Sequence, residues 1–451
     1  MRKRTVRILK GIGIAVIVLG LIYAIAVAVS VVKLRRAYTD LENDGRPMNR
    51  SNVIPPTVPN PENAALLYES GMLLLRAQPA PNEDLLRYLW SLSDRFMKES
   101  LSPEELDELQ RLIEQDIVTR ALWAVEQGTQ RRRCRFHLDY RGGFNMLMPH
   151  IPGLRELVRV LGAKACLDAR AGRLDDAWNM ARTQLGFADA LRTEPVLLSQ
   201  LVRLASIETS CETIRKICEI APPNSEQYRS LESLLSDYET RTPLVLGLDG
   251  ERLLIGEWAF NLLKSGSPKV LTADTGGEPE LGEVLLSLYS AFKPLSLADH
   301  VAYLRIMGDY TQLLQQPYSP DEASAMDRKV EQMGRRLHIV TAILTPAIGR
   351  VKERYWELVA QMRITRTGLA LLQYKQTHPD MSGFPAMLEA LGPSDVKDPF
   401  SDGPLLYRSE ADGFVLYSVG PDQKDNGGSP KQDKQETDWD IVWQFPSGRV
   451  R

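Results

Sequence analysis

Several residue types and motifs are scarce in this 451-residue chain, and each scarcity narrows the range of functions. It holds four cysteines and five histidines, and no two histidines have the HExxH spacing of a zinc protease. It also lacks the Gly-x-Ser-x-Gly elbow of a serine hydrolase and a phosphate-binding loop ending in Gly-Lys-Ser or Gly-Lys-Thr. The sequence therefore assigns no catalytic residue.

Neither sign of charge is in large excess, because 55 basic and 58 acidic residues leave a net charge of −3. The chain as a whole is therefore not attracted to nucleic acid, and we expect no nucleic-acid partner. The most basic cluster outside the N-terminus is RRRCR at residues 131–135. Clustered arginines can bind phosphates, and we interpret this cluster as a contact for lipid headgroups or for an acidic face of the same body.

Four cysteines do not require a disulfide framework, although an oxidising compartment would permit disulfides. Cys211 and Cys218 lie seven positions apart on an expected helix, about 10.5 Å along its axis, which is too far for a direct bridge. We expect Cys134, Cys166, Cys211 and Cys218 to be small core residues.

A single uncharged apolar run approaches the length of a membrane span. It covers residues 11–32, and its 22 residues extend about 33 Å as a helix, close to the thickness of a bilayer's hydrocarbon core. Ala24-Ile25-Ala26 offers a small-x-small cleavage site, so a signal peptide is the alternative. Signal peptides usually have shorter apolar regions, and the length favours an uncleaved anchor.

The basic tail at residues 1–10 predicts a single-pass membrane protein with its N-terminus in the cytoplasm. The rest of the chain would then be extracytoplasmic, in the periplasm. Residues 33–63 are predicted to be a stalk between membrane and body, because their larger part, residues 43–63, is rich in Pro and Asn and lacks apolar periodicity.

From residue 64 to 364 the apolar positions recur every three or four residues, which predicts an α-helical body. Ser102-Pro103 and Ser319-Pro320, each with Glu three residues after the Ser, mark two helix starts. A helical hairpin is expected at residues 163–191, with a break at Gly172. It resembles a tetratricopeptide hairpin over one repeat, and without a 34-residue period we expect an irregular helical array.

Short strands are expected after the helical pattern stops at His378-Pro379. Residues 404–409 and 413–418 form a hairpin around Asp412-Gly413, and residues 440–445 supply a third strand. We therefore predict a mainly α fold with an N-terminal transmembrane helix and a small antiparallel β module within residues 365–451.

The loop between the second and third strands is rich in carboxylates, Gly and Asn, which suits Ca²⁺. It is not an EF-hand, because a loop that begins at Asp422 has Lys424 at its third position and Asp433 at its twelfth.

Residues 365–443 resemble the globular head of the major pseudopilin of type II secretion systems. The resemblance is carried in order by these segments: LALLQYKQTHPD, GFPAMLEAL, Asp398-Pro399-Phe400, Tyr407-Arg408, LYSVGPD at 416–422 and DWDI at 438–441. In that family the loop after the second strand binds calcium. The resemblance implies a structural Ca²⁺ held by the carboxylates of Asp422, Asp438 and Asp440 and by the carbonyl of Val419.

The match is confined to this part of the chain. The anchor lies more than 300 residues before it and follows basic residues, unlike a pseudopilin, so we do not expect a fibre subunit. The whole arrangement resembles membrane-anchored helical envelope proteins of planctomycete-type bacteria.

These observations favour a non-enzymatic, membrane-anchored scaffold that binds another protein and ends in a calcium-stabilised module. One alternative is an extracytoplasmic enzyme, of the hydrolase class, whose site assembles from residues distant in sequence. Another is an accessory protein of a secretion or pilus-like system. The sequence names neither the protein partner nor the oligomeric state.

Overall fold

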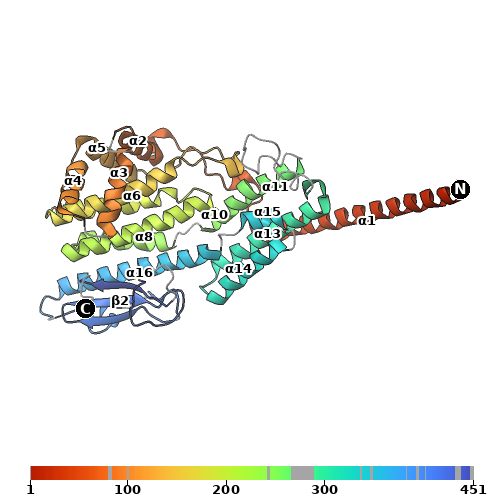
Figure 1. Cartoon of the computed structure of the whole chain (residues 1–451). Helices are drawn as coiled ribbons and strands as arrows, with labels where there is room; N and C mark the ends of the chain where they lie inside the picture. Colours follow the sequence, from red (N-terminus) through yellow and green to blue (C-terminus); the bar gives the residue numbers. More distant parts are fainter. Residues whose placement is uncertain are drawn as a thin grey trace.

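The fold was taken from a computed structural model of the whole chain. It describes residues 2–79, 84–98, 101–240, 244–265, 289–335, 338–345, 349–381, 383–392, 396–401, 403–431 and 438–446. One long helix projects from a helical body, and a small sheet lies on the far side of that body (Figure 1). The predicted fold class, mainly helical with a small C-terminal antiparallel sheet, is confirmed.

Helix α1 (Arg2–Asn43) is uninterrupted and places the N-terminus far from the body (Figure 1). From Leu9 onward it is long and apolar enough to cross a membrane, and it is the one helix in the described part of the chain that meets this criterion. Its length and composition are compatible with a membrane anchor or with a signal sequence.

The segment expected to be a stalk, residues 33–63, is packed in the structure. Residues 33–43 continue α1, because KLRRAYTDLEN contains neither Pro nor Gly to end the helix. In this part of α1, Ala37 and Leu41 are buried, and Leu41 lies beside Gly308 of helix α13. Farther on, Val53 is buried and the Arg252 side chain donates to the Pro47 carbonyl. The Pro- and Asn-rich composition thus indicated irregular backbone correctly, whereas the expectation of a free stalk was wrong.

The body is an irregular array of helices around one continuous core. In chain order its helices are α2 (Ala64–Arg76), α3 (Leu85–Lys98), α4 (Pro103–Ile113), α5 (Asp116–Thr129), α6 (His150–Arg170), α7 (Leu174–Ala188), α8 (Leu197–Ile220), α9 (Ser225–Thr240), α10 (Leu244–Gly250), α11 (Glu257–Lys264), α13 (Lys293–Gln315), α14 (Pro320–Arg335), α15 (Ile339–Leu344) and α16 (Gly349–Thr377). Helix α6 packs against α3, α7 and α8, and α8 in turn packs against α16.

Two local predictions for the body are confirmed. Helix α4 begins with a reciprocal capping box, in which Ser102 and Glu105 each accept a backbone N–H of the other. Helices α6 and α7 form the expected hairpin, and Gly172 between them has φ +77°, a left-handed conformation that favours glycine. The likeness of this hairpin to a tetratricopeptide repeat stays a prediction.

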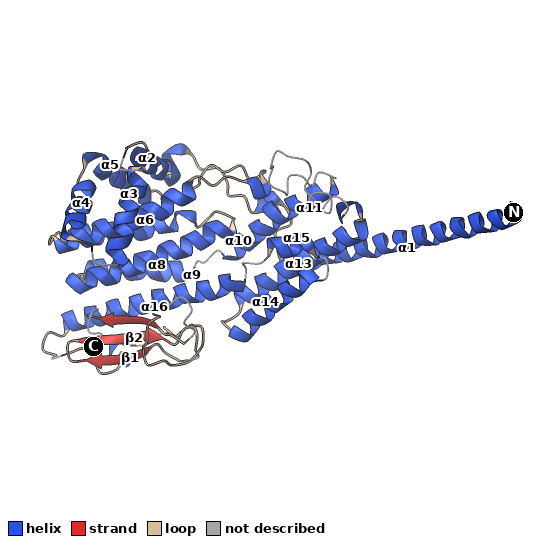
Figure 2. Cartoon of the chain, viewed as in Figure 1, coloured by secondary structure: helices blue, strands red, loops and turns tan. Residues whose placement is uncertain are grey.

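The sheet packs on α16 (Figure 2). Its strands β1 (Leu406–Glu410), β2 (Gly413–Ser418) and β3 (Ile441–Phe445) are antiparallel in the order β1-β2-β3. The approach to α16 is close, because a Cβ on Gly368 would lie 2.0 Å from the Trp443 ring. The boundary expected at residue 365 falls inside α16, so the body and the module share this helix.

Candidate functional site

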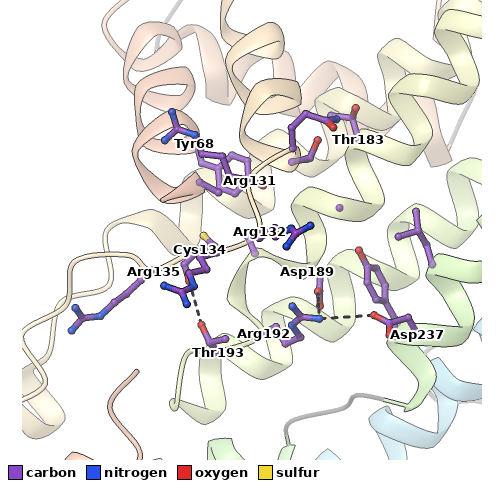
Figure 3. Close-up of a pocket in the computed structure, with 18 of the residues that line it drawn as sticks. Tyr68, Arg131, Arg132, Cys134, Arg135, Thr183, Asp189, Arg192, Thr193 and Asp237 are labelled. Atoms are coloured by element: carbon purple, nitrogen blue, oxygen red, sulfur yellow. Dashed lines mark hydrogen bonds and ion pairs between the residues drawn. The ribbon is translucent and has the colours of Figure 1, made fainter. Parts of the chain in front are cut away.

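One pocket of the body has a volume of about 740 Å³ (Figure 3). Its walls are the segment that follows α5, parts of α7 and α9, the turn after α7, and residues 55–58. Arginine is the most frequent residue in the lining. The charged lining residues are Arg131, Arg132, Arg133, Arg135, Arg182, Arg192, Asp189 and Asp237.

Asn63 holds the arginine-rich segment in place. The Asn63 side chain donates to the Arg135 carbonyl at 2.9 Å and accepts the Arg135 backbone N–H at 2.9 Å. The same side-chain oxygen caps α2 by accepting the backbone N–H of Ala65, and the Ala64 N–H donates to the Arg133 carbonyl. The segment is therefore tied to the start of α2 through its backbone, which leaves its side chains to line the pocket.

Two arginines of this segment contact the body itself. Arg131 donates to the carbonyls of Asn60 and Asn63, and Arg133 lies 3.6 Å from a Glu62 carboxylate oxygen. The Arg133–Glu62 pair is exposed, so it contributes little to stability. The expected contact with an acidic group of the same body thus holds for Arg133, whereas Arg131 binds carbonyls.

Arg132 and Arg182 are exposed, and neither has a hydrogen-bond or ion-pair partner in the described part of the chain. Arg132 extends from its segment toward the interior of the pocket (Figure 3). Arg182 comes from α7, 50 positions later in the sequence. Both guanidinium groups therefore have free donors for a ligand.

The two acids of the pocket are paired. Arg192 lies 3.5 Å from Asp189 and 3.9 Å from Asp237 (Figure 3). The buried Arg203, which is not part of the lining, contacts Asp189 at 2.6 Å. Burial raises the pKa of Asp189, and the neighbouring Arg203 and Arg192 oppose that rise. Because Arg203 pairs with Asp189 without lining the pocket, the lining keeps a clear excess of positive charge.

Two groups of the pocket that act as nucleophiles in other proteins, a thiol and a phenol, are held protonated here. Burial raises the pKa of the Cys134 thiol and of the Tyr68 phenol. The thiolate is the reactive form of cysteine, so Cys134 is a poor nucleophile at neutral pH. The described lining residues include no His, Lys or Glu, and the two acids that could act as a general base, Asp189 and Asp237, lie beside Arg192.

A Ser–His–Glu cluster next to the pocket does not have the geometry of a catalytic triad. Ser199 Oγ donates to Glu194 Oε1 at 2.5 Å, and His150 Nε2 lies 3.1 Å from Glu194 Oε2. A triad needs the imidazole between serine and carboxylate, but here both side chains bind the carboxylate. All three residues are buried, so substrate has no direct access to the serine.

The structure brings two of the predicted calcium ligands close together. Asp440 is buried, and its carboxylate accepts the backbone N–H groups of Asn426 (3.3 Å), Gly428 (2.7 Å) and Ser429 (3.2 Å). Asp422 accepts the side-chain amide of Asn426 at 3.1 Å, so Asn426 joins the two carboxylates. The loop is therefore closed onto Asp440 by backbone donors.

The other two predicted ligands have different surroundings. Asp438 is exposed and lies 3.7 Å from Lys424 Nζ. Val419 lies at the end of β2, where its N–H donates to Asp398. Asp433 and Glu436 of the same loop are outside the described residues. Within the part of the chain that the structure describes, no three Asp, Glu, His or Cys side chains converge as a metal site. Calcium binding stays a prediction.

Asp398 has a structural role that the sequence did not reveal. Its buried carboxylate accepts Ser418 Oγ at 2.6 Å, the Val419 N–H at 2.9 Å and the Phe400 N–H at 3.0 Å. It therefore ties the turn before β1 to the end of β2, and this explains the Asp in the Asp-Pro-Phe motif.

Comparison with protein-family models, curated proteins and solved structures finds no match for this chain. The resemblance of the C-terminal module to a pseudopilin head therefore stays a prediction.

Sequence analysis identified only part of the pocket. The run RRRCR was a visible signal, and it supplies four of the six arginines. Arg182 and Arg192 carry no such signal, because their approach to residues 131–135 depends on how α7 packs against α5.

Proposed function

We propose that this protein is a membrane-anchored binding protein whose helical body holds an anionic ligand in the arginine-lined pocket. One observation carries the proposal. Six arginines line a pocket that contains only two acids, and two of those arginines have no partner in the described chain. Phosphate and carboxylate groups match the fork of N–H donors on a guanidinium.

Size and polarity support a small-molecule ligand or a charged chain end. A volume of about 740 Å³ lies within the usual range for small-molecule pockets. Thr183, Ser230 and Ser233 line the same space, and their hydroxyl groups are further donors to anionic oxygens, whereas the Thr193 hydroxyl donates to the Cys134 carbonyl.

The surroundings favour binding over catalysis. Cys134 stays protonated, and Ser199 is buried and donates to a carboxylate. In a hydrolase a nucleophile lies within hydrogen-bond reach of a base, whereas the two acids of this pocket lie beside arginines. The compact volume of the pocket suits a small anion.

The proposal includes the membrane topology. Helix α1 is the anchor, its basic N-terminus lies in the cytoplasm, and the body lies on the extracytoplasmic side of the bacterial inner membrane. Two features support an anchor over a cleaved signal, namely the length of the apolar stretch and the continuation of α1 into the core of the body at Ala37 and Leu41.

A structural Ca²⁺ in the C-terminal module also belongs to the proposal. Its support is the link between Asp422 and Asp440 through Asn426, together with the exposure of Asp438 beside the same loop.

Titration calorimetry on the full chain in detergent micelles tests the pocket, with pyrophosphate and citrate as anionic probes and sucrose as an uncharged one. We expect both anions to bind and sucrose not to bind. Removing both free guanidinium groups, in Arg132→Ala/Arg182→Ala, should weaken anion binding at least tenfold, because one hydrogen bond to a charged group contributes about 1.5–3 kcal/mol.

The matched control removes two exposed arginines outside the pocket, in Arg120→Ala/Arg229→Ala. It should bind as wild type does. The variant Arg132→Lys/Arg182→Lys keeps the charge and loses the fork, so intermediate affinity is expected. Equal affinity in the Ala variant and in the control would refute the pocket as an anion site.

A further inference from the structure

The body begins to contact α1 inside the apolar stretch that is expected to lie in the membrane. The ring of Tyr23 lies 5.6 Å from the ring of Phe292, the residue before α13. Farther along α1, Ala26, Val27, Ser30 and Val31 are half-buried, and they lie on one face of the helix. The body therefore lies alongside the last ten residues of the apolar stretch.

Helix length conflicts with a body that stays wholly outside the bilayer. If the membrane ended before the first contact with the body, the twelve residues from Gly11 to Ile22 would have to span it. Twelve helical residues extend about 18 Å, whereas the hydrocarbon core is about 30 Å thick. Lys10 bounds the other end of the stretch, so the missing length lies on the side of the body.

The missing 12 Å or so corresponds to about eight residues of helix, which moves the edge of the hydrocarbon core to about Ser30. Phe292 is level with Tyr23, seven residues before Ser30. The Phe292 side chain would therefore lie about 10 Å below the edge of the hydrocarbon core.

The side chains of Phe292 and of the residue that follows it suit this depth. Phe292 is apolar, and 52% of its surface is exposed. Its neighbour Lys293 is exposed, and its long side chain can reach the headgroups while its stem stays in lipid.

We propose that the tip of the body, formed by Phe292 and the first turn of α13, inserts into the lipid bilayer beside α1. The protein then contacts the membrane through two elements, and α1 does not move as a free tether. This inference rests on the part of the proposed function that makes α1 an anchor.

Depth measurement by electron paramagnetic resonance tests the insertion. The full chain is reconstituted in nanodiscs of phosphatidylcholine and phosphatidylglycerol and carries one spin label at Phe292→Cys. Two reference labels are Ile17→Cys, which lies within the apolar stretch, and Leu147→Cys, which is 83% exposed on the body. Labelled wild type gives the background, since its four cysteines are buried or half-buried.

We expect oxygen to relax the labels at 292 and 17 more strongly than a water-soluble nickel complex, and the reverse at 147. If the label at position 292 behaves like the water-exposed label at 147, while the label at 17 is lipid-exposed, the insertion is refuted and the anchor stands. If the label at position 17 also behaves as water-exposed, the proposal that α1 is an anchor fails.

If the Cys variant misfolds, Phe292→Trp in dibrominated lipid provides a second test, in which tryptophan fluorescence is measured. Quenching above the wild-type level supports insertion, and its absence contradicts insertion.

Discussion

Among the described residues, the charged groups of the C-terminal acidic loop have partners within the loop, whereas two arginines of the arginine-lined pocket have none. In the loop, Asp440 accepts three backbone N–H groups from residues 426–429, and Asp422 accepts an N–H and an amide group close to it in sequence. In the pocket, Arg132 and Arg182 have no partner within the described residues. The loop meets most of its own hydrogen-bonding needs, whereas the pocket leaves donors for another molecule.

This difference shows that a cluster of charge in the sequence does not by itself indicate a ligand site. A carboxylate within a few residues of several N–H groups in a Gly-containing turn finds its partners locally. A guanidinium has five donors and a long side chain, and its partners depend on which elements pack nearby. The acidic loop attracted the stronger functional prediction from sequence, yet the basic segment lines the open pocket.

The largest expected effect comes from removing a carboxylate whose partners are all internal. Asp398→Ala leaves Ser418 Oγ and two backbone N–H groups without their acceptor, so we expect the C-terminal module to lose about 3 kcal/mol of stability. Hydrogen exchange of the β2 amides in the full chain measures this loss. The control Asp438→Ala removes an exposed ion pair and should cost less than about 0.5 kcal/mol. Equal exchange in the two variants would contradict the internal role of Asp398.

The buried carboxyl of Glu251 accepts few hydrogen bonds, so it should make the stability of the protein depend on pH. Burial raises the pKa of Glu251 to about 7 from an ordinary value of 4.5, opposed only by a hydrogen bond from the Leu197 backbone. The folded protein therefore binds more protons than the unfolded chain between these values. Stability from this group is complete below pH 4.5 and is lost as the pH rises through 7. Between pH 6 and 8 this group alone should lower the free energy of unfolding by about 1.4 kcal/mol.

Thermal melts at pH 6 and pH 8 check this expectation. In Glu251→Gln the fall in melting temperature should be smaller than in wild type, because the amide does not titrate. Burial also raises the pKa of Glu357 to about 7, so a residual slope of the same sign remains. The exposed Glu42→Gln is the control and should keep the wild-type slope. An unchanged slope in Glu251→Gln would show that this carboxyl does not titrate near neutral pH.

The smallest expected effect concerns calcium. At five times its dissociation constant, a structural Ca²⁺ should stabilise the protein by about 1 kcal/mol. Asp440 has a role in the loop without metal, so its replacement destabilises the module in either case. The informative variant is therefore Asp422→Asn/Asp438→Asn. Calcium should raise the melting temperature of wild type and not of this variant, and no calcium effect on wild type would remove the calcium site from the proposal.

Sequence periodicity and turn chemistry predicted most of the secondary structure. The Asp412-Gly413 turn, the strand at residues 413–418 and the α4 cap at Ser102 lie where their residues placed them, since each depends on contacts within a few positions. The stalk was wrong for the same reason. A high content of Pro and Asn predicts an irregular backbone, but it does not predict whether a residue such as Val53 is buried against other parts of the chain.

The sequence by itself determined that this chain is helical, has one membrane-length apolar helix and ends in a small hairpin-based sheet, because such features arise from local periodicity and local hydrogen bonds. Only the tertiary structure decided that Arg132, Arg182 and Arg192 line one pocket and that Phe292 lies beside Tyr23. Residues separated by 50 or more positions meet through the packing of whole helices, and the identity of a single side chain does not encode that packing.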